Sequence, residues 1–116
     1  MDENEHAHGP IMRLFQVTVK EGAAKKLLSQ FATTSADVVQ NEPGNEGYCF
    51  GQGVSVDGDR LIFASFWQDL DAVKERFGED WQNSYLPVGY DEMIEEHSLT
   101  HIDLRNGWFV RLNPEG

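Results

Sequence analysis

Two kinds of hydrophobic pattern alternate along the chain. Stretches with a period of two predict β-strands, because successive side chains of a strand point to opposite faces of a sheet. Four stretches are predicted as strands, residues 11–19, 47–56, 61–68 and 97–105; the third is apolar on both faces rather than alternating, which suits a central strand. Between the second and the third lies Asp57-Gly58, a dipeptide that predicts a tight hairpin turn. In the first stretch, Arg13 falls on the same face as Phe15 and Val17.

Two longer stretches have apolar residues at steps of three and four, which predicts amphipathic helices. The first covers residues 22–41 and is ended by the Glu-Pro-Gly that follows, since proline disfavours a helical residue before it. The second begins after Asp69 or Asp71, either of which can cap its first turn, and ends at Gly78.

The predicted order of elements is strand, helix, strand, strand, helix, strand. This is the ferredoxin-like β-α-β-β-α-β arrangement of the α+β class, with two helices on one face of a four-stranded antiparallel sheet. We expect the other, open face to present bulky side chains such as Tyr48, Phe50 or Trp67. A second copy of the chain, packed sheet to sheet with two-fold symmetry, is the natural cover. The sequence therefore predicts a homodimer that forms a dimeric α+β barrel.

The pattern also sets the domain limits. One folded domain is predicted over residues 11–105, between a flexible tail at 1–10 and a turn with a short extension at 106–116. A chain of 116 residues has no room for a second core. The Asn-Gly dipeptide that opens the extension favours a tight turn, after which residues 108–112 are predicted to return as a fifth short strand.

Composition narrows the class of protein. Apolar residues make up 40% of the chain, which suits a globular core. The 20 acidic residues against 9 basic ones give a net charge of -11, which argues against nucleic acid or an anionic membrane as a partner. Cys49 is the only cysteine, so no internal disulfide is expected, and we predict a buried, inert thiol. With no apolar run of about 18 residues and no signal-peptide pattern, the expected location is the cytoplasm.

The element order and two short motifs together resemble the antibiotic biosynthesis monooxygenase (ABM) domain. The motifs are Glu42-Pro43-Gly44 with Gly47-Tyr48, and the spaced set Trp67, Asp69 and Ala72. The resemblance covers Met12 to about Leu104. It implies a dimeric α+β barrel with a pocket between the sheet and the helices of each subunit. Activities in such a family include cofactor-independent oxygenation of polycyclic phenols, haem degradation and small-molecule signalling.

The sequence departs from the family pattern in two places. Ser65 stands where the family often has Glu, two residues before Trp67. The segment after the second helix, often Ser-x-His in the family, reads Asp-Trp-Gln-Asn-Ser-Tyr over residues 80–85. The missing histidine counts against the haem-degrading branch, which uses it as the iron ligand. Trp67 matches the tryptophan of the cofactor-free branch, whose asparagine and arginine have no assigned counterparts here.

His97 and His101 are the candidate catalytic bases, because imidazole titrates near neutrality. They lie four residues apart on one predicted strand and therefore about 13 Å apart on one face, too far for both to bind one metal. We favour His101, which is nearer the middle of the strand. The alternative is that both are polar positions on a sheet face or at a dimer contact.

Aromatic residues suggest a pocket for a ring. The candidate ring-holding and polar contact residues are Trp67, Tyr48, Trp81, Tyr85, Asn83 and Ser65. Trp81 and Tyr85 are four apart, so a helical turn would place them on one face. The alternative is plain core packing. No metal site is expected, since His6 and His8 lie on the tail and the acidic run near Glu95 is typical of a solvated surface.

The main hypothesis is an ABM-like monooxygenase that oxygenates a small aromatic or quinol-type molecule without a cofactor. Trp67 and the other aromatic residues would hold the ring, and His101 or His97 would take the proton. The alternative from another class is a non-catalytic dimeric module of the same fold that binds a small molecule. Haem binding and degradation is a third possibility.

Overall fold

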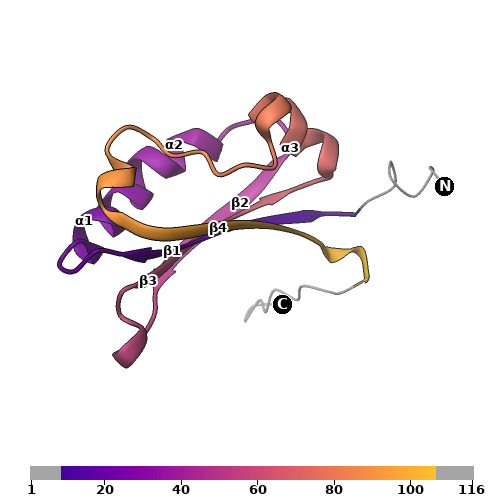
Figure 1. Ribbon diagram of the computed structural model, residues 1–116. Helices are drawn as coiled ribbons and strands as arrows, with labels where there is room; N and C mark the ends of the chain where they lie inside the picture. The colour runs from indigo at the N-terminus through magenta and orange to yellow at the C-terminus, as the bar shows by residue number, and fades with distance from the viewer. Residues whose placement is uncertain (1–8, 107–116) are drawn as a thin grey trace, which may run out of the picture.

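The computed structural model describes residues 9–106, which form a four-stranded antiparallel sheet and two helical regions in the predicted order (Figure 1). The strands are β1 (Ile11–Val19), β2 (Asn45–Gln52), β3 (Arg60–Trp67) and β4 (Ile94–Asp103). They lie in the order β2-β3-β1-β4. The first helical region consists of α1 (Ala24–Gln30), a π-helical turn (Phe31–Ser35) and α2 (Ala36–Val39); the second is α3 (Leu70–Phe77). The predicted α+β ferredoxin-like fold is confirmed.

The first helical region is one continuous helix in the prediction but contains a π-helical turn in the structure. Two β-branched threonines occupy this turn, and the Thr33 hydroxyl donates to the carbonyl of Ser29, which competes with the regular backbone ladder. The wider turn leaves Phe31 and Ser35 buried under the helix. Ser35 Oγ lies 2.7 Å from the Tyr90 hydroxyl, which fixes the helix to the segment before β4.

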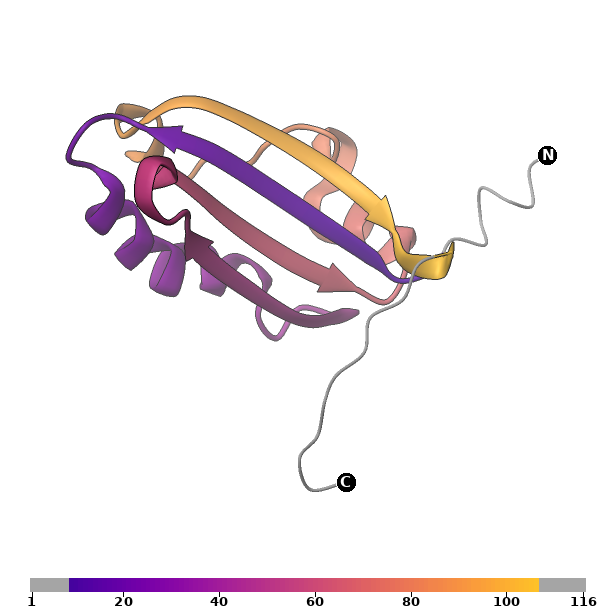
Figure 2. The same ribbon diagram turned by 90° about the horizontal axis from the view of Figure 1, so that it is seen from below.

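Both helical regions lie on one face of the sheet, and Figure 2 shows the strands in front of them. Directly opposite residues of paired strands share a face. Phe15 pairs with Phe63 under the helices, and Phe50 pairs with the same Phe63 from the other side. Tyr48 likewise pairs with Ser65 on this face, and Trp67 is fully buried.

The prediction that Tyr48, Phe50 or Trp67 lie on the open face is therefore wrong. The alternation in β2 separates large from small residues but does not say which set meets the helices, and the large set does. The open face carries the small residues of β2 together with aliphatic and aromatic side chains of the inner strands. These are Gly47, Cys49, Gly51, Met12, Leu14, Ile62, Ala64 and Phe66. Cys49 is exposed on this face, so the prediction of a buried thiol is also wrong.

The connection between β2 and β3 is longer than the two-residue turn that Asp57-Gly58 predicts. Gly53 N donates to the carbonyl of Arg60, which closes the ladder, and a 3-10 turn, Ser55–Asp57, follows. A side chain at Gly53 would meet the Asp57 backbone, so the chain can double back there only with glycine. The predicted strand residues beyond 52 consequently leave the sheet.

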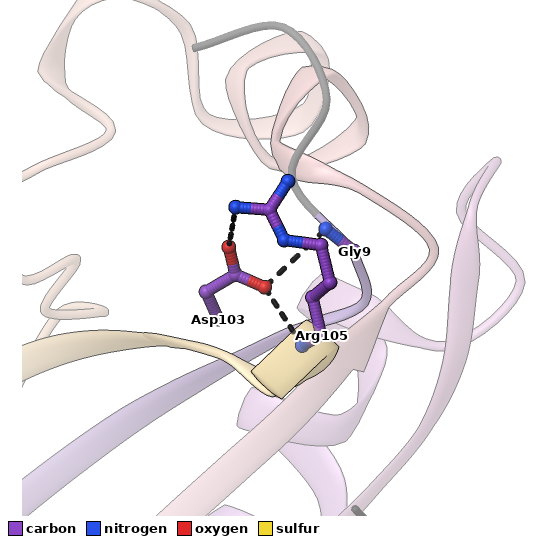
Figure 3. Close-up of polar contacts among 3 residues, drawn as sticks. All are labelled: Gly9, Asp103 and Arg105. Atoms are coloured by element: carbon purple, nitrogen blue, oxygen red, sulfur yellow. Dashed lines mark hydrogen bonds and ion pairs between the residues drawn. The ribbon is translucent and has the colours of Figure 1, made fainter. Parts of the chain in front are cut away.

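Asp103 joins the two ends of the described chain (Figure 3). Its Oδ1 accepts from the backbone N–H of Gly9 at 3.3 Å and of Arg105 at 2.8 Å, and its Oδ2 lies 3.5 Å from Arg105 Nη2. Leu104 N also donates to the carbonyl of Pro10. The start of β1 and the end of β4 are thus held side by side. The predicted fifth strand and the histidines of the tail lie outside the described residues.

Within residues 9–106, no helix is both long enough and apolar enough to cross a membrane.

Candidate functional site

A cavity of about 50 Å3 lies between the sheet and the helices. Its walls come from β1, β3 and β4 on one side and from the π-helical turn, α2, α3 and the α3–β4 connection on the other. They are mainly aromatic and aliphatic, and they include Phe15, Phe63, Phe77, Pro87 and Leu99. The polar side chains in the lining are Arg13, Ser35, Ser65 and Tyr85.

Arg13 is the charged group of this cavity and is 6% exposed. It projects from β1, where alternation places it under the helices with Phe15. Its Nη1 donates to the Trp81 carbonyl at 2.6 Å and contacts His101 Nε2 at 3.0 Å, and its Nη2 donates to the Asn83 carbonyl at 3.3 Å. The guanidinium carbon also lies 3.7 Å from the centre of the Phe77 ring, a cation–π contact. Arg13 therefore ties the α3–β4 connection to the sheet.

His101 acts as a hydrogen-bond acceptor in this arrangement. Arginine can only donate, so His101 Nε2 supplies the lone pair and the proton of the neutral ring is on Nδ1. Burial, and then the positive charge of Arg13, lower the pKa of His101 to about 4. Trp81 packs edge-on against the ring, with centroids 5.0 Å apart. In this state His101 is a weak base whose one free lone pair is already used.

His97 lies on the same face of β4 and is exposed; because β4 begins at Ile94, His97 rather than His101 is nearer the middle of the strand, contrary to the prediction. Its Nδ1 is 3.1 Å from Ser84 Oγ, and its ring is 6.1 Å from that of Phe15, which lines the cavity. Among the described residues, no partner is found for its Nε2. His97 and His101 therefore share a face, as predicted, but have different surroundings.

Trp67 lies behind the cavity rather than in its lining. Its Nε1 donates to Ser65 Oγ at 2.8 Å, and its ring meets Phe77 edge-on with centroids 5.8 Å apart. Ser65, which stands where the family often has Glu, is 2% exposed and lines the cavity. Since its oxygen accepts from the indole, its own hydroxyl hydrogen is available for another acceptor.

The remaining candidates contribute in different ways. Tyr85 lines the cavity and is 55% exposed, which places it at the mouth. Trp81 and Asn83 hold Arg13 through their backbone carbonyls, and the chain from Gly78 onwards forms turns that do not align Trp81 with Tyr85 as a helix would. Tyr48 stacks on Phe63 outside the lining, with centroids 5.6 Å apart.

Arg13 is the residue that sequence reasoning left out of the site. The sequence contained a signal for it, because Arg13 is a charged residue on the same face of the predicted strand as the apolar Phe15 and Val17. Its partners on the α3–β4 connection are backbone carbonyls, which no residue type reveals. Between residues 9 and 106, no group of three or more His, Cys, Asp or Glu side chains is arranged to hold a metal ion.

Comparison with known proteins gives a consistent picture. The family described as "Antibiotic biosynthesis monooxygenase" matches residues 10–84. No curated protein matches the chain. A structure from Shewanella oneidensis is similar with a TM-score of 0.66 and 20% identity, over 82% of this chain and 90% of that one.

Two further solved structures carry functional descriptions. A candidate antibiotic biosynthesis monooxygenase from Caulobacter crescentus has a TM-score of 0.60 and 20% identity, over 87% of this chain and 94% of its own. A haem-degrading protein from Mycobacterium tuberculosis, in haem-free form, has a TM-score of 0.60 and 21% identity, over 89% of this chain and 99% of its own. At these identities the structures establish a shared fold.

Proposed function

Because the chain belongs to the antibiotic biosynthesis monooxygenase family, we propose that it oxygenates a small aromatic or quinol-type substrate without a bound cofactor. The observation that carries this proposal is the cavity between the sheet and the helices. Its apolar walls surround one buried cation, Arg13, and a few hydroxyl groups. Apolar pockets with a few convergent polar groups are typical of small-molecule sites.

The chemistry starts with removal of a proton from the bound substrate. The resulting carbanion passes an electron to dioxygen, and the two radicals combine at the ring carbon. In the keto tautomer of a single-ring quinol that carbon carries two hydrogens, so the substrate itself supplies all four electrons. One oxygen atom becomes its carbonyl oxygen, and the other leaves as water. The reaction then needs neither an external reductant nor a metal from the protein.

Of the two candidate bases, the geometry favours His97. His101 is engaged by Arg13, and its pKa is lowered to about 4, so it is neutral but weakly basic at pH 7. His97 lies outside the cavity lining, with its ring 6.1 Å from that of Phe15, and it is reachable from solvent. We assign His97 the role of base and His101 the role of positioning Arg13.

The aromatic candidates form two layers around the substrate ring. Tyr85 and the rings of Phe63 and Phe77 contact it directly, since they line the cavity. Trp67 lies behind these residues, where its indole N–H donates to the Ser65 hydroxyl and orients it. Tyr48 lies outside the cavity lining and stacks on the ring of Phe63. Trp81 and Asn83 keep Arg13 in place.

The size of the cavity limits the substrate. About 50 Å3 is less than the roughly 150 Å3 of an engineered cavity that binds benzene. A single ring therefore enters only if the exposed Tyr85 and its neighbour Pro87 move outward. A fused-ring substrate would need a much larger opening, so the proposal is restricted to single-ring compounds.

The second candidate function is a non-catalytic module that binds a small molecule, and it is favoured by the weak basicity of His101, whose Nε2 is already engaged by Arg13. The small cavity volume also argues against haem binding, which is relevant because the Mycobacterium tuberculosis neighbour is described as a haem-degrading protein. A porphyrin is far larger than this cavity, and His101 Nε2 is already bonded to Arg13. The residues present do not fit haem. We expect no Soret shift when haemin is added at equal concentration; a shift would contradict this.

Oxygen consumption tests the enzymatic proposal. The wild-type protein is mixed with a panel of single-ring quinols in an oxygen electrode, and the rate without protein is subtracted. We expect uptake above that background and a drop of at least tenfold in His97→Gln. His101→Gln serves as the matched histidine control. No uptake with any quinol, with binding retained, would leave the binding module as the function.

We also propose that the open face of the sheet is covered by a second copy of the chain. Apolar side chains of the inner strands, among them Leu14 and Ile62, lie on this face, away from the helices. Light scattering at micromolar concentration is expected to give the mass of a dimer, and Leu14→Lys to shift it toward the monomer. A monomeric wild-type protein would refute the proposal.

A further inference from the structure

Within residues 9–106, Arg13 is buried without a negatively charged partner. The chain is acidic overall, with a net charge of -11, yet the three groups that accept from its guanidinium are two backbone carbonyls and a neutral imidazole. Buried charges in proteins are normally paired, because leaving an ion unpaired in an apolar environment is expensive. The protein therefore keeps a positive charge in the cavity wall that its own described residues do not neutralise.

The guanidinium also has donors to spare. It carries five N–H groups, and the contacts above use both on Nη1 and one on Nη2. The Nε–H and the second Nη2–H remain. Across residues 9–106, no buried side-chain nitrogen or oxygen lacks a hydrogen-bond partner. Because no partner of Nε is found there, this atom must border open space, and Arg13 lines the cavity.

Ser65 adds a third donor on the same side. It is the residue directly opposite Arg13 in the pairing of β1 with β3, which puts the two Cβ atoms about 5 Å apart. Its Oγ accepts from Trp67, so its hydroxyl hydrogen can point into the cavity. A carboxylate is an acceptor for both kinds of donor, and its hydrogen bonds to a guanidinium are among the strongest in proteins.

We propose that this cavity binds a single-ring aromatic carboxylate, with its carboxylate on Arg13 and Ser65 and its ring against Phe63 and Phe77. The inference rests on the proposed function in taking this cavity as the substrate site, and it names the class of substrate. The rings of Phe63 and Phe77 line the cavity beside the cation, so charge and ring are recognised together.

The charge state of Arg13 agrees with this assignment. Burial, and then the charge of Arg76, lower the pKa of Arg13 to about 10, so the guanidinium is still a cation at neutral pH. A bound anion offsets the penalty that burial imposes. It also offsets the charge of Arg13, which is the second cause, after burial, of the lowered pKa of His101.

The probes are benzoate and its neutral isostere benzamide, measured by titration calorimetry with the full chain at pH 7. We expect benzoate to bind at least tenfold more tightly than benzamide. Arg13→Gln is expected to abolish the difference, and Arg13→Lys to retain part of it, since lysine keeps the charge but not the fork of donors. Arg76→Gln is the matched control, because Arg76 stacks on the same Phe77 ring but lies outside the cavity lining.

Equal affinity for the two probes, no binding of either, or full benzoate binding by Arg13→Gln would overturn the inference. If circular dichroism shows that Arg13→Gln does not fold, the inference is judged on two other results: the ratio of benzoate to benzamide affinity in the wild-type protein, and the same ratio in Arg13→Lys. Failure of the proposed function appears differently. Arg13-dependent benzoate binding without oxygen uptake on any quinol refutes the oxygenase alone. Oxygen uptake on quinols that benzoate does not inhibit refutes the carboxylate site alone.

Discussion

His101 makes the stability of the fold depend on pH in a way that can be isolated. Its pKa is about 4 in the folded protein, against the usual 6.5 expected in the unfolded chain. Above pH 6.5 the ring is neutral in both states. As the pH falls from 6.5 to 4, the unfolded chain takes up a proton that the folded protein does not, so the free energy of unfolding decreases. Below pH 4 the loss is complete.

The size of the effect follows from the same difference. The difference between the pKa of His101 in the folded and in the unfolded protein corresponds to a loss of unfolding free energy of roughly 3 kcal/mol at most. His101 is only partly buried, so solvent screening reduces the expected loss to about 1–2 kcal/mol. The cause is burial first and the neighbouring Arg13 charge second.

Urea unfolding at pH 7 and at pH 4.5 measures this loss. His101→Gln keeps an acceptor for Arg13 but cannot be protonated. Between pH 7 and pH 4.5, its free energy of unfolding should therefore fall by about 1–2 kcal/mol less than that of the wild-type protein. The many carboxylates titrate equally in both proteins and cancel in the comparison. His97→Gln controls for removing an imidazole from the same strand. If His101→Gln loses as much stability as wild type, the explanation from a partly buried, neutral His101 is refuted.

Three further substitutions test the packing around the site, each by urea unfolding at pH 7. Trp67→Phe keeps a ring but removes the indole donor to Ser65, and should cost about 1–3 kcal/mol; a neutral result would contradict that hydrogen bond. Asp69→Ala removes the cap that accepts from Ala72 N at 2.9 Å and should cost about 1 kcal/mol, whereas Asp69→Asn should cost less. Gly44→Ala should cost at least about 1 kcal/mol, because Gly44 has φ +83° and an added Cβ would lie 2.5 Å from the Cβ of Ala72; unchanged stability would show that α3 can move.

The fold was largely predictable from the sequence because its periodicities are local. The period-two stretch of β1, the stretch of β3 that is apolar on both faces and the apolar stripe of α3 each follow from side-chain geometry within one element. What failed depended on contacts between elements. Whether Tyr48 and Phe50 or their small neighbours meet the helices is decided by the pairing of β2 with β3, which the alternation itself leaves open.

The candidate site shows the same division. Ser65 and Tyr85 line the cavity and were singled out from motif and composition. The central Arg13 was not, because its role arises from the backbone carbonyls of a turn that is distant in sequence. The low basicity of His101 arises first from burial and second from that cation, and both depend on contacts between elements, since residues 13 and 101 meet only through the pairing of β1 with β4.

The contact at Asp103 has a consequence for chain connectivity. It holds Gly9 and Arg105 side by side, so a short linker could join these two positions without disturbing the sheet (Figure 3). The connection from 53 to 59 lies away from the cavity lining, with Val54 and Val56 exposed to solvent. A circular permutant opened there would begin with β3 and end with β2. Its sheet order and cavity would be unchanged, while β2 and β3 would no longer be adjacent in the chain.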